Sequence, residues 1–138
     1  MIHFEENFFK KFKFEADEIE RHLESALHDL DIARKDSFPE VQFSYSFQAL
    51  IKAGITLIAK AGNVKVRSLP GHHVKILSKM SEILQDQDIL TLGNAMRMKR
   101  NTDLYGGGQS ITEKEARDYL KFVERIILRV EKIIRLKG

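Results

Sequence analysis

The sequence predicts an all-α protein, an antiparallel up-and-down bundle of about five helices. Long segments carry apolar residues at the spacing of a helix, and prolines and glycines mark the breaks between these segments. No segment outside residues 1–14 and 63–67 has a convincing strand pattern. With 138 residues, the chain is expected to form one bundle domain over residues 15–138, preceded by an arm at residues 1–14.

The amino-acid composition indicates a globular protein and argues against disulfide-bonded and membrane-spanning classes. A hydrophobic fraction of 43% and a charged fraction of 31% are typical of soluble globular proteins. The chain has no cysteine, which excludes disulfides and thiolate zinc sites. No apolar stretch is long enough for a membrane span or a secretion signal, so we expect a cytoplasmic protein without a membrane partner. The net charge of +3 permits nucleic-acid binding without requiring it.

The first 14 residues alternate phenylalanine with lysine. Phe4, Phe8 and Phe12 fit a helical stripe, whereas Phe12 and Phe14 alternate as in a strand, so the sequence leaves the conformation open. One interpretation is an aromatic and basic strip for nucleic acid. The favoured one is an arm that packs its phenylalanines on the bundle or on a second subunit, because five exposed rings would form an aggregation-prone patch.

Two long helices are predicted next, at residues 15–34 and 39–61. The first has a single apolar face. The second follows Pro39, which suits a first helical turn, and it is apolar on more than one side. A helix of this kind is central in its bundle or also faces another subunit. This pattern is one reason to predict a homodimer.

A third helix, predicted from residue 68 to about residue 84, carries the adjacent histidines His72 and His73. His73 falls on the apolar side of the helical wheel and His72 at its edge. Adjacent side chains diverge by ~100° on a helix, and no carboxylate has ligand spacing. The sequence therefore predicts no metal and no cofactor here, and ordinary hydrogen-bonded histidines are the favoured interpretation.

The fourth helix, at residues 89–104, breaks its own apolar pattern. Arg100 falls inside an arc otherwise formed by Ile89, Leu92, Gly93, Met96 and Leu104. A buried charge is costly unless it is paired. Arg100 either reaches out to water or pairs with Asp103 on the same helix, or it serves a binding site or an interface.

The last helix is predicted over residues 112–136. Thr112 and Glu115 have the spacing of a capping box. The helical wheel divides into an apolar face and a basic face, the latter formed by Arg117, Lys121, Arg125, Arg129, Lys132 and Arg135. A solvated surface is the favoured interpretation of the basic face, and a phosphate-contacting stripe is the alternative.

The segment from Arg97 to Tyr105, together with the order of the helices, resembles a HEPN (higher eukaryotes and prokaryotes nucleotide-binding) domain. Catalytic HEPN ribonucleases carry an arginine, usually followed by asparagine or another polar residue, and a histidine four to six positions later. Arg100 and Asn101 match this motif, but Tyr105 stands where the histidine would be. HEPN relatives often have a histidine near the start of the third helix, so His72 or His73 is expected to line the same groove.

The resemblance implies three alternatives. The favoured one is a non-catalytic module that binds nucleotide or RNA phosphate, with a nucleotidyltransferase partner as in toxin–antitoxin systems. Its ligand contacts would be Arg97, Lys99, Arg100, Asn101, Tyr105, His72 and His73. The second is a metal-independent ribonuclease with a site composed across a homodimer, in which Arg100, Asn101 and Tyr105 would be catalytic. The tyrosine argues against it, because a phenol with a pKa of ~10 is a poor base at neutral pH. The third is a purely structural dimerisation domain.

Overall fold

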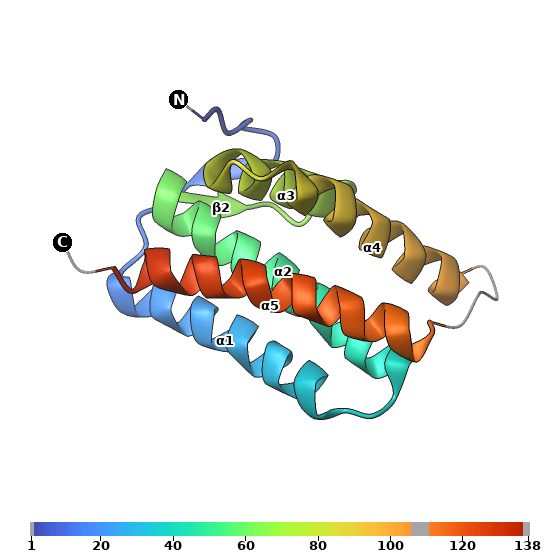
Figure 1. The fold of residues 1–138 in the computed structure, drawn as a ribbon. Coiled ribbons are helices and arrows are strands. Elements are labelled where there is room, and N and C mark those ends of the chain that lie inside the picture. Colours follow the sequence, from blue (N-terminus) through green and yellow to red (C-terminus); the bar gives the residue numbers. More distant parts are fainter. Residues whose placement is uncertain (1, 106–110, 137–138) are drawn as a thin grey trace.

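The computed structural model describes residues 2–105 and 111–136, except the side chains of residues 102–105. It confirms the predicted all-α bundle, with five helices in the described residues (Figure 1). The helices are α1 (Ala16–Lys35), α2 (Pro39–Gly62), α3 (His72–Leu84), α4 (Gln87–Tyr105) and α5 (Glu113–Ile134). Two short strands, β1 (Phe9–Lys11) and β2 (Val64–Val66), complete the described elements.

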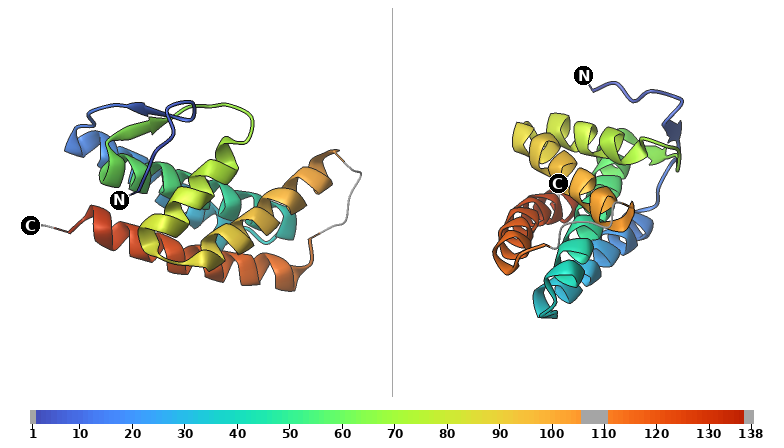
Figure 2. Two further views of the ribbon diagram at one scale, coloured as in Figure 1. Left: turned by 90° about the horizontal axis from the view of Figure 1, so that it is seen from above. Right: turned by 90° about the vertical axis from the view of Figure 1, so that its right-hand side faces the viewer.

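Helix α2 is the centre of the bundle. Helices α1 and α5 pack along it, and α3 crosses it on another side (Figures 1 and 2). Its largest side chains, among them Phe47, Leu50, Leu57 and Ile58, are almost completely buried. The bundle itself therefore accounts for a helix that is apolar on more than one side, without a second subunit.

Helices α3 and α4 form a pair on top of this core, and two glycines allow the close packing. A β-carbon at Gly54 of α2 would collide with Ile76 of α3, and one at Gly93 of α4 would lie 2.6 Å from a methyl carbon of Leu77. The two helices meet at the turn around Gln85 and diverge from there, as the left view of Figure 2 shows. The start of α3 and the second half of α4 consequently face each other across the open end of a V.

The N-terminal arm packs on the bundle of its own chain, the interpretation that the sequence favoured. Strand β1 pairs antiparallel with β2, and the rings of Phe4, Phe8 and Phe9 contact the core. Lys79 of α3, whose side chain is 6% exposed, forms an ion pair with Glu5 of the arm at 2.8 Å. The hydrogen bond from Lys79 lowers the pKa of the Glu5 carboxyl, which keeps the pair charged.

Within the described residues, no helix is long and apolar enough to cross a membrane. The predicted start of the third helix was wrong by four residues. Residues 68–71 form a loop because Gly71 has a left-handed φ of +85° and the amide of His72 donates to the carbonyl of Leu69.

Candidate phosphate-binding pocket

A pocket of about 440 Å³ lies at the open end of the V between α3 and α4. Residues of the loop before α3, of the first turn of α3 and of the second half of α4 line it. They are Ser68, Leu69, Pro70, Gly71, His72, His73, Arg97 and Asn101. Four of the seven residues predicted from the sequence, namely His72, His73, Arg97 and Asn101, thus share one pocket.

The start of α3 gives the pocket a positive end. No side chain caps this helix, and its first turn has no acidic residue. The first backbone N–H groups of a helix lack partners within the helix, and the helix dipole adds partial positive charge at the same end. Such an N-terminus favours an anion.

The two histidines lie side by side, with ring centroids 4.2 Å apart. His72 Nδ1 lies 2.7 Å from the carbonyl oxygen of Leu69. Because a carbonyl only accepts hydrogen bonds, Nδ1 must carry the proton, and in the neutral ring Nε2 is the acceptor. His72 therefore has a defined tautomer at the edge of the pocket.

His73 is held as the neutral base. Its ring meets the Phe47 ring edge-on at 5.6 Å. Burial lowers the pKa of His73 to about 4, and repulsion from His72, Arg100 and Arg97 contributes. At neutral pH, the side-chain charge of the pocket therefore comes from the arginines and not from His73.

Arg97, in the wall of the pocket, and Arg100, near the pocket residue His73, form no ion pair with a described carboxylate. Arg97 Nε donates to the Asn94 amide oxygen at 2.9 Å, which orients the guanidinium and leaves its charge in place. The guanidinium carbon of Arg100 lies 5.7 Å from the centre of the buried Phe47 ring. This cation–π contact explains why an arginine occupies a position on the apolar stripe of α4. The alternative pair with Asp103 involves a side chain outside the described residues.

Two predicted ligand contacts, Lys99 and Arg100, are not among the residues that line the pocket. Lys99 forms an ion pair with Glu115 at 2.8 Å, which connects α4 to the first turn of α5. The hydrogen bond from Lys99 lowers the pKa of Glu115. The side chain of Tyr105 lies outside the described residues.

Sequence reasoning missed Phe47 and the loop of residues 68–71. Phe47 belongs to the apolar face of α2, where one aromatic residue among many gives no sign of a role beside a pocket. The Pro70-Gly71 pair is a turn signal directly before the histidines, and it could have identified the loop.

In the described part of the chain, no three histidine or acidic side chains are arranged to hold a metal ion. Comparison of the chain with family models, with curated proteins and with solved structures gives no match. The geometry of the pocket is therefore the main support for a function.

Proposed function

We propose that this protein binds the phosphate of a nucleotide or of RNA in the pocket between α3 and α4. One observation carries the proposal: Arg97, which pairs with no described carboxylate, and the uncapped start of α3 line one pocket, and Arg100 lies close enough to the pocket residue His73 to help lower its pKa. Arginine binds phosphate through two parallel hydrogen bonds, and a helix start adds backbone donors. Asn101 supplies a further amide to orient the ligand.

The Arg100-Asn101 sequence and the order of the helices support a HEPN-like module. In this proposal the module is a homodimer that binds nucleotide or RNA without cleaving it and works with a nucleotidyltransferase partner. Light scattering at micromolar concentration should then show about twice the 16.0 kDa chain mass. A monomer at every concentration would remove the homodimer and leave the pocket to be tested by itself.

The test of the pocket uses a fluorescent nucleoside triphosphate and a short labelled RNA. Arg100→Ala and Arg97→Ala should each weaken binding at least tenfold, about 1.4 kcal/mol. Arg100→Lys should restore only part of the affinity, because a lysine offers no planar pair of donors. Arg117→Ala, which removes an exposed arginine from α5, is the charge-matched control.

Thermal unfolding of each variant separates binding from folding. The contact of Arg100 with Phe47 contributes only about 0.5–2 kcal/mol, so Arg100→Ala should remain folded. If it remains folded and binds both ligands as the wild type does, the pocket is not a phosphate site. If Arg117→Ala loses as much binding affinity as the pocket variants do, binding depends only on the net charge of the protein and not on the pocket.

The defined tautomer of His72 favours one second candidate, a metal-independent ribonuclease. A histidine whose Nε2 accepts at the pocket edge can remove a proton from a ribose hydroxyl or return one to a leaving group. Cleavage of RNA by the wild type in the presence of a chelator, abolished in His72→Ala and Arg100→Ala, would establish it. Binding without cleavage supports the non-catalytic module.

A further inference from the structure

Six cations lie on or next to the two-stranded β1–β2 ribbon, and none of them lines the pocket between α3 and α4. We call this group the basic ribbon: Lys10, Lys11, Lys13, Lys60, Lys65 and Arg67. Among the described residues, no carboxylate forms an ion pair with any of the six. Of the acidic residues in the arm, Glu5 pairs with Lys75 and Lys79 of α3, and Glu6 lies beside Lys10 and Arg67 without an ion pair to them in the described residues.

The register of the ribbon places two lysines directly opposite each other. Lys10 is the cross-strand partner of Lys65, and the hydrogen bonds of Arg67 to Phe8 and of Phe12 to Asn63 flank this pair. Opposite residues in an antiparallel pair have β-carbons ~5 Å apart, where like charges destabilise the sheet. A bound polyanion would turn this unfavourable pair into a favourable one.

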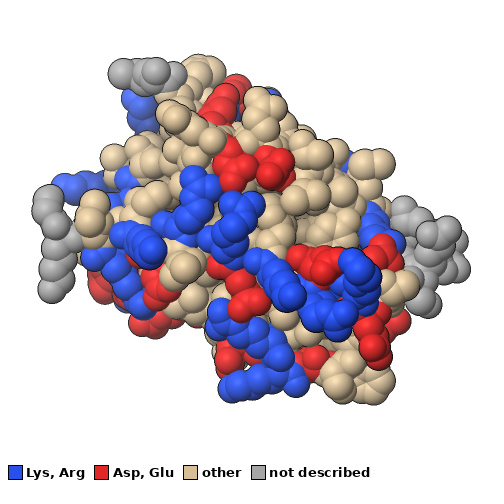
Figure 3. Space-filling model, in the orientation of Figure 1, with Lys and Arg blue, Asp and Glu red and all other residues tan. Residues whose placement is uncertain are grey.

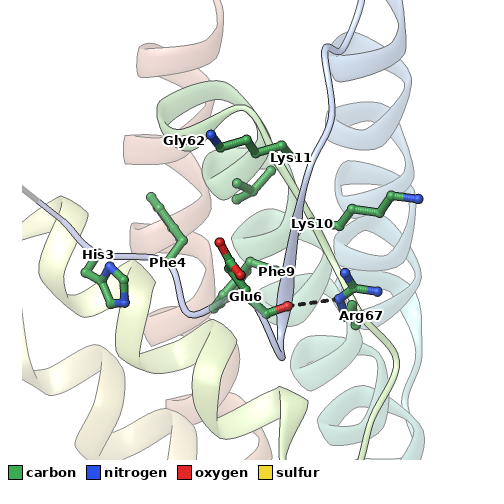
Figure 4. A pocket seen from close by; sticks show the side chains of 9 residues that line it. His3, Phe4, Glu6, Phe9, Lys10, Lys11, Gly62 and Arg67 are labelled. Atoms are coloured by element: carbon green, nitrogen blue, oxygen red, sulfur yellow. Dashed lines mark hydrogen bonds between the residues drawn. The ribbon is translucent and has the colours of Figure 1, made fainter.

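Figure 4 shows how these side chains are arranged. Lys10 and Arg67 extend on one side of β1, and Lys11 extends on the other side toward Gly62. Arg67 Nε donates to the Glu6 backbone carbonyl at 3.1 Å, which orients its guanidinium without neutralising it. A cavity of about 510 Å³ beside the strand has Lys10, Lys11 and Arg67 in its wall, together with one acidic residue, Glu6.

Partly buried phenylalanines lie next to these cations. Phe8 and Phe12 occupy the same alternating positions of the arm as Lys10. Lys65 Nζ lies 4.8 Å from the Phe12 ring centre, and Lys75 Nζ lies 5.3 Å from that of Phe8. Alternating cations and aromatic rings are the elements with which proteins hold a single-stranded nucleic acid.

We propose that the basic ribbon binds the sugar–phosphate backbone of a single-stranded nucleic acid. The site is separate from the pocket between α3 and α4, and the inference does not depend on the function proposed for that pocket. Lys10, Lys65 and Arg67 contact successive phosphates. Phe12 lies beside a base.

The direction of the apolar side chains argues against a membrane surface as the partner. Phe4, Phe8 and Phe9 pack against the core. None of the large exposed apolar side chains lies in residues 2–14 or 60–67. The ribbon therefore has no fully exposed apolar side chain that could enter lipid, and the partly buried ring of Phe12 can contact a base only from the surface.

The experiment measures the binding of a fluorescein-labelled 12-nucleotide single-stranded RNA by anisotropy between 50 and 200 mM NaCl. The test variant is Lys10→Gln with Lys65→Gln, which removes two charges from the ribbon. The control is Lys35→Gln with Lys114→Gln, which removes two charges from exposed lysines that form ion pairs elsewhere. Melting curves establish that both variants are folded.

The ribbon variant should bind at least tenfold more weakly than the wild type at 100 mM salt. The slope of log affinity against log salt should become shallower by about 1.4, because each phosphate contact contributes about 0.7 for single strands. The control should keep the wild-type slope. An unchanged slope in the ribbon variant, an equal loss in the control, or a wild type that binds no RNA at 50 mM salt would overturn the proposal.

Two further arms separate this inference from its competitors. The first arm measures the binding of the wild type and the ribbon variant to phosphatidylserine vesicles and to an acidic peptide. If the ribbon variant loses binding to one of these and still binds RNA as the wild type does, the ribbon serves that other partner and the proposal is overturned. If Arg97→Ala and Arg100→Ala leave nucleotide and RNA binding unchanged while the ribbon variant weakens RNA binding, the pocket proposal fails and this one stands.

Discussion

The basic face of α5 and the basic ribbon have similar numbers of cations and differ in what surrounds them. Arg125 and Arg129 of α5 both contact Asp86 at the α3–α4 turn, at 3.3 and 2.9 Å, and Arg135 contacts Glu20 of α1 at 2.7 Å. Figure 3 shows acidic and basic side chains intermixed over this part of the surface. The cations of the ribbon have no such described partners.

This difference shows that a row of cations in a sequence does not by itself predict a binding site. The arginines of α5 connect it to α1 and to the α3–α4 turn, so most of their charge is used within the fold. The alternative interpretation of this helix as a phosphate-contacting stripe loses support. A positive charge left without a carboxylate is the better indicator of an anionic ligand.

The largest effect should come from removing the carboxylate that α5 shares. Asp86→Ala should lower the free energy of unfolding by about 2–3 kcal/mol, because it removes the carboxylate that two arginines share and an acceptor for the Asp88 amide. Burial opposes ionisation of Asp86, but the hydrogen bond from Arg125 and the Asp88 amide outweigh it and lower its pKa. Urea unfolding measures the change. Loss of less than 1 kcal/mol would show that these pairs are surface contacts of little value.

The lowered pKa of His73 in the pocket should make the stability of the protein depend on pH. Its pKa of about 4 lies below the ordinary value of 6.5, so the unfolded state binds more protons between these values. Stability should therefore fall as the pH drops from 6.5 to 4. The pKa difference sets a limit of roughly 3 kcal/mol, which partial exposure reduces to about 1–2 kcal/mol.

Variants and NMR titration test this pH dependence. His73→Gln should flatten the stability profile in that window, whereas His28→Gln, at an exposed position on α1, should not. In the Arg97→Gln, Arg100→Gln double variant the pKa of His73 should move toward 6.5. A pKa unchanged by the loss of both arginines would mean that burial and the neighbouring His72 set it.

The periodic helices were predictable because their burial pattern is local. Residues 15–34 and 39–61 were predicted for helices that span Ala16–Lys35 and Pro39–Gly62. The Thr112–Glu115 capping box is formed as its spacing predicted. The ribbon could not be predicted, because each strand has three residues and its partner is more than 50 positions away.

The candidate site was predictable only in part, for the same reason. Spacing along α4 brought Arg97 and Asn101 to one side, and the position at the start of a helix brought in both histidines. The contact of Arg100 with Phe47 and the pair of Lys99 with Glu115 join different helices. Such contacts depend on how the helices cross, which a sequence pattern does not contain.

The last prediction concerns the smallest change in stability. It tests the role of the unpaired charges in the basic ribbon most directly, because stability and RNA binding should change in opposite directions. Lys10→Glu places a carboxylate opposite Lys65, so the like-charged pair becomes an attractive one and the free energy of unfolding should rise by about 0.2–1 kcal/mol. Binding of single-stranded RNA should weaken more than in Lys10→Gln.

The matched control is Lys11→Glu, whose cross-strand partner is Val64, so it gains no such pair. Urea unfolding and anisotropy on the three variants decide the outcome. If Lys10→Glu and Lys11→Glu change stability equally, the opposed lysines cost the fold nothing, and their repulsion no longer supports a polyanion site.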